Sequence, residues 1–297
     1  MEKITFTCET ITPMFLAGAD SRSPELRPPS IKGAMRFWWR ALHGHLPLKQ
    51  LKETESKIFG GTGRVQARSC FSIQIQMTDD PIIKEEKPVP HKHFTIPSFT
   101  VGNRFLVTFT MIGQPNGNNG EPLFTVRHLR ELFLLTCYLG GFGKRVRRGF
   151  GSVDVIEIDG SRDAIPQEIS LEYIHGLIQT FSPHYNLSND RITFTFHGRA
   201  PAYGYLISVE LGKKYQSEEQ LLRRVSLATH DLKRRHSYAY EPSMGFAGRH
   251  GRYASPVFVS VVRGSVKPLK STLNLAPPRN AERASLAVQR DFKDLIL

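Results

Sequence analysis

Apolar and polar positions alternate along several stretches of the first half of the chain, as they do in half-buried strands. The alternation predicts strands at residues 4–9, 70–77, 105–112 and 150–158. Apolar residues at helical spacing predict one helix from Ser30 to about His45, and another that Thr125 caps and that ends near Tyr138. The stretch 79–103 is rich in proline and lysine, and we expect it to project as a loop or hairpin arm.

The second half continues with the same mixture of patterns. It predicts a helix capped by Ser170, strands at 192–196 and 203–211, a helix from Ser217 to about Arg235, a strand at 256–263 and a last helix at 282–296. Residues 3–7 resemble residues 191–195, which leaves open whether the halves arose by duplication. Because strands and helices do not alternate as in a parallel sheet, we expect an α+β fold. Its units would be residues 1–160 and 161–297, each an antiparallel sheet with helices on one face.

Charge indicates the class of partner. The 297 residues include 40 Lys and Arg against 27 Asp and Glu, a net charge of +13, which favours polyanions such as nucleic acid. A membrane partner is disfavoured, because no apolar run approaches the roughly 18 residues of a spanning helix and the first residues lack the apolar stretch of a signal peptide. Cys8, Cys70 and Cys137 are widely spaced and lie in apolar stretches, so we expect buried thiols in a cytoplasmic protein.

The first predicted helix carries a narrow stripe of cations between two apolar sides. Lys32, Arg36 and Arg40 lie along it, with His43 at its end, and no carboxylate occurs between residues 26 and 47. Free backbone N–H groups at Ser30 would add to its attraction for an anion. We therefore predict phosphate contact by Ser30, Lys32, Arg36 and Arg40. The alternative is that the arginines are solvated or pair with distant carboxylates, and we expect Trp38 and Trp39 mainly in the core.

A second basic feature is the glycine-rich stretch 140–151, GGFGKRVRRGFG. Its spacing fits neither a Walker A loop nor a dinucleotide fingerprint. Glycines allow close approach of the main chain to a polyanion and cations neutralise phosphates, so we predict RNA contact there. The cations concerned are Lys144, Arg145, Arg147 and Arg148, and Arg249 and Arg252 form a further cluster beside glycines. A merely mobile basic loop is the alternative.

Together these motifs resemble the RAMP superfamily of CRISPR proteins, most of all the first-subunit family of the type III-B Cmr effector complex. The likeness rests on FLAGAD at 15–20, SIKGAMRFWWR at 30–40, the loop 140–151 and RYASP at 252–256. The resemblance implies two ferredoxin-like (RRM-like) modules and a subunit that holds guide RNA toward its 3′ end. It also implies neighbouring RAMP subunits, help in receiving target RNA, and an arm at 79–103 that suits an RNA-kinking hairpin.

Catalysis is the competing interpretation. Some RAMP relatives process CRISPR RNA with a histidine, for which His43 and His45 are candidates, and others cut target RNA with a loop carboxylate and a metal, for which Asp20 is the candidate. A lone carboxylate in such a loop is more often a turn former. The residues 91–93, HKH, have no second cluster of metal-ligand spacing. We therefore expect no enzyme activity, no cofactor and no metal.

Overall fold

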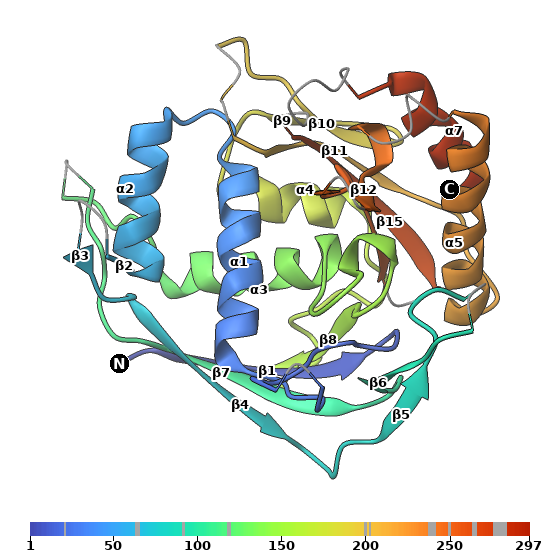
Figure 1. The fold of residues 1–297 in the computed structure, drawn as a ribbon. Coiled ribbons are helices and arrows are strands. Elements are labelled where there is room, and N and C mark those ends of the chain that lie inside the picture. Colours follow the sequence, from blue (N-terminus) through green and yellow to red (C-terminus); the bar gives the residue numbers. More distant parts are fainter. Residues whose placement is uncertain are drawn as a thin grey trace.

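Two antiparallel sheets lie in separate layers, with helices between them and further helices outside the second sheet (Figure 1). The computed structural model describes residues 1–20, 22–62, 66–90, 93–117, 120–198, 201, 203–236, 242–248, 251–262, 266–275 and 284–297. The order of layers is first sheet, helices, second sheet, helices. The predicted α+β class with antiparallel sheets is confirmed.

The first sheet has the strand order β4–β7–β1–β8, and every neighbouring pair is antiparallel. Its strands are β1 (Lys3–Thr10), β4 (Phe71–Met77), β7 (Arg104–Met111) and β8 (Val153–Ile158). Every second residue of β1 and β7 is buried, as the alternation predicted. β8 begins at Val153 rather than at Phe150, because the residues before it close the glycine-rich loop.

Helices α1 (Pro28–Leu42) and α3 (Val126–Leu139) pack on the inner face of this sheet, and α2 (Leu48–Phe59) packs beside α1. The short strands β2 (Gly61–Thr62) and β3 (Gln66–Ala67) follow α2. Thr125 caps α3, as predicted, by accepting a hydrogen bond from His128 N. Trp38 and Trp39 are both buried, in agreement with their expected place in the core. The two-sided packing predicted for the first helix is therefore confirmed.

The second sheet has the order β14–β15–β11–β10–β9 and is also antiparallel. Its strands are β9 (Tyr185–Ser188), β10 (Arg191–Phe194), β11 (Tyr205–Leu211), β14 (Val257–Val262) and β15 (Lys267–Asn274). Its helices are α4 (Leu171–Gln179), α5 (Glu218–Arg235) and α7 (Leu286–Ile296), and a hairpin of β12 (Phe246–Gly248) and β13 (Gly251–Tyr253) precedes β14.

Helices cover both faces of the second sheet, which differs from the prediction of helices on one face. α5 and α7 pack on the outer face, where Val257, Val259 and Val261 point toward them. α1, α3 and α4 contact the inner face. The ring centroids of Trp38 on α1 and Phe258 on β14 are 5.1 Å apart, so one core joins the two halves of the chain.

The likeness between residues 3–7 and 191–195 does not mark equivalent strands. In each sheet a strand, a helix, a hairpin of two strands and a second helix follow one another: β1–α1–β4–β7–α3 and β11–α5–β14–β15–α7. The strand orders β4–β7–β1–β8 and β14–β15–β11–β10 therefore make β11 the counterpart of β1. β10, which carries residues 191–194, lies in the place that β8 has in the first sheet.

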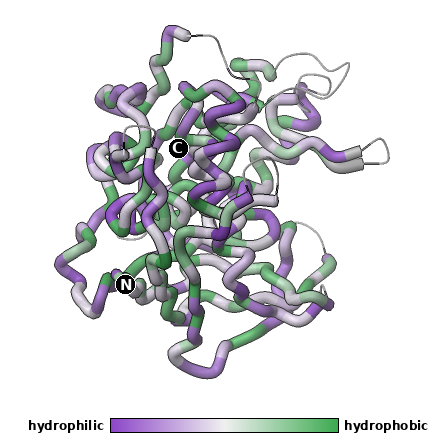
Figure 2. Tube along the Cα trace, turned by 90° about the vertical axis from the view of Figure 1, so that its left-hand side faces the viewer, coloured by the Kyte–Doolittle hydropathy of each residue, from purple (hydrophilic) through white to green (hydrophobic). Residues whose placement is uncertain are grey.

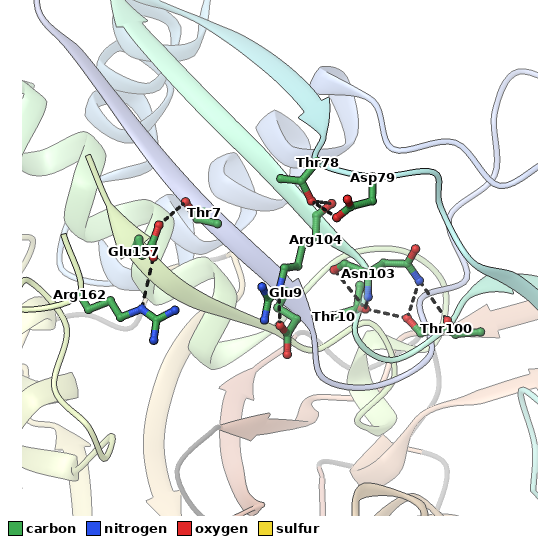
Figure 3. A network of polar contacts seen from close by, with 10 residues as sticks. All are labelled: Thr7, Glu9, Thr10, Thr78, Asp79, Thr100, Asn103, Arg104, Glu157 and Arg162. Carbon is green, nitrogen blue, oxygen red and sulfur yellow. Dashed lines mark hydrogen bonds and ion pairs between the residues drawn. The ribbon is translucent and has the colours of Figure 1, made fainter. Parts of the chain in front are cut away.

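The predicted arm is a two-stranded hairpin of β5 (Ile83–Glu86) and β6 (Ile96–Phe99). Asn103 fixes its root by donating through Nδ2 to the carbonyls of Ile82 (3.0 Å) and Thr100 (2.9 Å) and by accepting from Ile82 N at 2.7 Å. Figure 3 shows Asn103 beside Thr10 and Thr100 at this junction. The arm does not project entirely, because Phe99 is buried against the body.

Hydropathy varies over short distances along the chain. Figure 2 shows hydrophobic and hydrophilic positions interleaved along the trace. Among the helices of the described ranges, none combines the length and the apolar composition that a membrane crossing requires. Cys8, Cys70 and Cys137 are buried free thiols, as expected.

Candidate nucleic-acid interface

A cleft of about 430 Å³ opens where three segments of the first half meet Phe258 of β14. Phe15 to Gly18 form one wall, one side of α1 forms the floor, and the glycine-rich loop closes the other side. The residues of α1 that line it are Ser30, Ala34, Phe37 and Trp38. Of the predicted contact residues, the cleft brings together Ser30, Lys144 and Arg147.

The glycine-rich loop is folded tightly against the protein's own main chain. Phe142 N donates to Gly151 O at 2.9 Å, and Lys144 N donates to Phe15 O at 2.8 Å. Gly141 and Gly151 have φ values of +105° and +68°, and a Cβ at either position would collide with a backbone carbonyl of the loop. These two glycines therefore serve contacts within the protein.

Two of the loop arginines anchor it to the second half. Arg147 lies 4.3 Å from the ring centroid of Phe258 and 5.7 Å from that of Phe37, and it donates to Ser255 O. Burial lowers the pKa of Arg147 to about 10, which leaves it charged at neutral pH. Arg148 donates to the carbonyls of Met244 (2.7 Å) and Val257 (3.3 Å). The loop is thus tied to Met244 and to the segment from Ser255 to Phe258, and it is not a free basic loop.

The other predicted cations of this region have separate places. Lys144 and Arg145 are exposed beside the cleft, in the turn before the short 3-10 helix η1 (Val146–Arg148). Lys144 makes no side-chain hydrogen bond or ion pair with the described residues. Arg252 is exposed on β13, and Arg249 lies outside the described residues.

The cation stripe of α1 does not face the cleft. Glu55, which is buried on α2, binds both arginines. Arg40 Nη2 donates to Glu55 Oε1 at 2.5 Å, and Arg36 Nε forms an ion pair with the same oxygen at 3.2 Å. Arg36 also donates to Gly60 O. Lys32 lies 5.1 Å from the ring centroid of Phe71, and burial lowers its pKa. The alternative of arginines paired with a distant carboxylate is confirmed, and the stripe and the loop lie on different sides of α1.

The start of α1 also differs from the prediction. The helix begins at Pro28, two residues before Ser30, and prolines occupy its first positions. Ser30 N donates to Arg27 O at 3.0 Å, and Ile31 N approaches the same carbonyl. The N–H group expected to be free at Ser30 is therefore already bonded within the chain, which removes this reason for predicting an anion there.

The residues considered for catalysis have structural partners. His43 Nδ1 lies 2.6 Å from Trp39 O, and burial lowers its pKa to about 4. His45 Nδ1 lies 3.2 Å from Ser182 Oγ, and burial lowers its pKa as well. Asp20 is exposed and accepts hydrogen bonds from Ser23 Oγ (2.5 Å) and from Arg22 N (2.9 Å). The Ser23 hydroxyl lowers the pKa of Asp20, and the geometry is that of a turn former.

Histidine, cysteine and carboxylate side chains of the described ranges form no group of three or more that could hold a metal ion. His91 lies outside those ranges.

Among the aromatic side chains that line the cleft, Phe15, Phe37 and Phe258 were not predicted as functional residues. Phe15 and Phe258 line it with little exposure, and Phe37 is half-buried in its floor. Phe37 belongs to the apolar side of α1 that lies opposite Ile31 and Met35. This second apolar side was the sequence feature that could have pointed to Phe37 as a cleft residue. Phe258 could not be assigned from sequence, because it approaches Phe37 only across the interface between the two halves.

Residues 7–154 match the RAMP superfamily. The chain is 33% identical over 190 residues to the CRISPR system Cmr subunit Cmr1-2 of Pyrococcus furiosus, which covers 52% of this chain and 96% of that protein. The chain belongs to the RAMP superfamily and is Cmr1-like. It is also 32% identical over 164 residues to Cmr subunit Cmr1-1 of the same organism, which covers 51% of this chain and 47% of that longer relative.

Solved structures share the fold of this RAMP protein along its whole length. The crystal structure of apo Cmr1 from Pyrococcus furiosus superposes with a TM-score of 0.63 at 22% identity, covering 100% of this chain and 96% of the other. A second similar structure is a chain of the type III-B Cmr-beta complex, which was solved bound to cognate target RNA and AMPPnP in the presence of ssDNA. It gives a TM-score of 0.62 at 10% identity and covers 99% of this chain and 98% of the other.

The open face of the first sheet is a second surface to consider in this RAMP protein, because aromatic side chains on an open sheet can stack against RNA bases. Thr7 and Glu9 of β1 point to this face, where Arg104 Nε donates to Glu9 at 2.7 Å and Thr7 donates to Glu157 at 3.3 Å (Figure 3). The outward positions of β1 in the described chain carry no aromatic ring. The cleft is therefore the better candidate.

Proposed function

We propose that this chain is a non-catalytic RNA-binding subunit of a type III-B CRISPR (Cmr) ribonucleoprotein effector complex in the cytoplasm. It would hold guide RNA toward its 3′ end, beside other RAMP subunits, and help receive target RNA in antiviral defence. Membership of the Cmr1-like proteins supports this proposal, as does the similar fold in a complex described as bound to cognate target RNA.

The fold in this proposal consists of two ferredoxin-like (RRM-like) modules. The first unit has the element order β1–α1–β4–β7–α3–β8 and the strand order β4–β7–β1–β8, which fits a ferredoxin-like module. In the second unit the elements β11–α5–β14–β15–α7 follow the same order, and β10 takes the position of the last strand of the module.

The observation that carries the proposed function is the composition of the cleft. Phe37 supplies a half-buried aromatic surface on its floor, and Lys144 and Arg145 supply exposed charge at its side. Single-stranded RNA is bound in this way, by bases against aromatic rings and by phosphates against cations. The α1 stripe would contribute through packing, because Arg36 and Arg40 are held by Glu55.

The proposal predicts RNA binding that weakens with salt and depends on the cleft. Changing Lys144 and Arg145 together to Glu should reduce affinity for a single-stranded RNA about ten-fold or more in fluorescence anisotropy. The slope of log affinity against log salt should fall by about 1.4, because each phosphate contact on a single strand contributes about 0.7.

Changing Lys213 and Lys214 to Glu provides the matched control, since they form an adjacent, exposed pair elsewhere. Both variants lower the net charge of +13 by the same four units. The control should lose less than about three-fold, because long-range attraction alone is screened at physiological salt. Equal losses in the two variants would show that net charge, and not the cleft, binds RNA.

The same labelled RNA tests the absence of catalysis. We expect it to stay intact with the wild-type chain, with or without a divalent metal. Cleavage by the wild type that His43→Ala, His45→Ala or Asp20→Ala abolishes would establish the ribonuclease alternative.

A further inference from the structure

A second hollow, of about 270 Å³, lies on the outer face of the second sheet beneath α7. The strand register places Lys270 opposite Glu210 and Thr272 opposite Ser208, with Thr193 beside Ser208 on the next strand. These polar residues continue the face on which Val257 and Val259 pack against α5 and α7. Phe258, which lines the cleft, points to the inner face, so the hollow and the cleft are on opposite faces of one sheet.

Positive charge gathers in this hollow around one carboxylate. Glu210 accepts from Lys270 at 2.6 Å, from Lys293 at 2.7 Å and from Arg191 at 2.8 Å. Burial raises the pKa of Glu210, but the ammonium of Lys270 and the bonds from the other cations outweigh it and lower the pKa to about 2. Glu210 is therefore ionised and fully used by its partners at neutral pH.

Three cations share this one negative charge, and a fourth, Arg290 of α7, lines the same hollow. Asp190 contributes little negative charge to the hollow, because its carboxylate is largely exposed and lies 3.8 Å from Lys293 Nζ. Lys270 is 4% exposed, so its charge is held away from water. A buried charge is stable only when it is paired, and the carboxylates present leave a positive surplus.

The hollow is also rich in hydrogen-bond donors. Among the described residues, the hydroxyls of Thr193 and Ser208 and the guanidinium of Arg290 have no side-chain partner. Thr272 Oγ1 accepts from Lys270 at 3.1 Å, which leaves its own proton free to donate. Hydroxyls and cations that converge in this way are the groups that bind phosphate oxygens.

We propose that this basic pocket, formed by Arg191, Thr193, Ser208, Lys270, Arg290 and Lys293, binds a phosphate group. The phosphate belongs either to the backbone of RNA or to a small phosphorylated compound. The site is separate from the cleft and does not depend on the function proposed for it.

The test uses the full-length protein and inorganic phosphate as the probe. Phosphate should raise the melting temperature of the wild type above that in chloride at equal ionic strength, because a ligand that binds the folded state stabilises it. The double variant Arg290→Gln, Thr193→Val should lose this difference. Among the described residues, neither Arg290 nor Thr193 binds another side chain, and valine matches threonine in shape and in its preference for strands. The control is Arg234→Gln, which changes an exposed arginine of α5, and this variant should keep the stabilisation by phosphate.

A single-stranded RNA titration of the same variants separates the two sources of phosphate. A loss of about three-fold or more in RNA affinity, together with the lost phosphate effect, assigns the pocket to the RNA backbone. An unchanged RNA affinity with a lost phosphate effect assigns it to a small phosphorylated compound. A wild type that phosphate stabilises no more than chloride, or a double variant that responds like the wild type, overturns the proposal.

Discussion

At the scale of single residues, Glu55 determines what the α1 stripe can do. Its side chain is buried and binds Arg36 and Arg40 together. Glu55→Gln should lower the free energy of unfolding by about 2 kcal/mol, because it leaves two partly buried arginines without their counter-charge. Urea unfolding followed by circular dichroism measures the loss.

Glu53→Gln on the same helix is the control, and it should change the free energy by less than about 0.5 kcal/mol. If both variants unfold at the same urea concentration, the ion pairs contribute little and the α1 arginines are available to RNA. A weaker RNA affinity in Glu55→Gln without a loss of stability would contradict the packing role that we assign to the stripe.

At the scale of elements, the glycines of the loop and of α4 should respond oppositely to the same substitution. Gly151→Ala places a Cβ against Phe142 O at a φ of +68° and should destabilise the protein by about 2 kcal/mol or more. Gly176→Ala lies within α4, where a Cβ meets nothing within 4 Å, and should stabilise by about 0.5–1 kcal/mol. The urea concentrations at which the two variants and the wild type are half unfolded measure these changes. A neutral Gly151→Ala would mean that the loop can rearrange without cost.

Elements with local indications could be predicted from the sequence. Thr125, Ser170 and Ser217 each accept a hydrogen bond from the backbone N–H three residues ahead, so their helices were found. α2 and β15 were missed because each buries a charged residue, Glu55 and Lys270 respectively. The partner that makes each burial favourable comes from a different element, and a local pattern does not contain it.

The candidate site shows the same limit. The sequence predicts RNA contact by all four cations of the loop 140–151, but Arg147 and Arg148 turn inward while Lys144 and Arg145 turn outward. Which of these cations contacts solvent depends on Phe258 and Ser255, more than 100 residues away in the chain. A sequence pattern can count the cations of a loop but cannot assign their directions.

At the scale of the whole molecule, the shared core predicts that the two halves unfold together. Residues 1–160 alone would expose Trp38 and Phe37 where they now contact Phe258, and Tyr138 O would lose the Ser260 hydroxyl. The full chain should show one transition with coincident near- and far-ultraviolet circular dichroism. The 1–160 fragment should lack the near-ultraviolet signal of fixed aromatic rings. Two separate transitions, or a fragment with native-like spectra, would show that the halves are independent domains.

The anchoring of the glycine-rich loop has a mechanical consequence. One end of the loop forms the wall of the cleft, while Arg147 and Arg148 hold its middle to the strand that begins at Val257. The loop is short, and hydrogen bonds to Phe15 and Pro13 brace it on the other side, so it has little slack. The position of the strand that begins at Val257 therefore fixes the position of the loop, and with it the width of the cleft that the loop bounds.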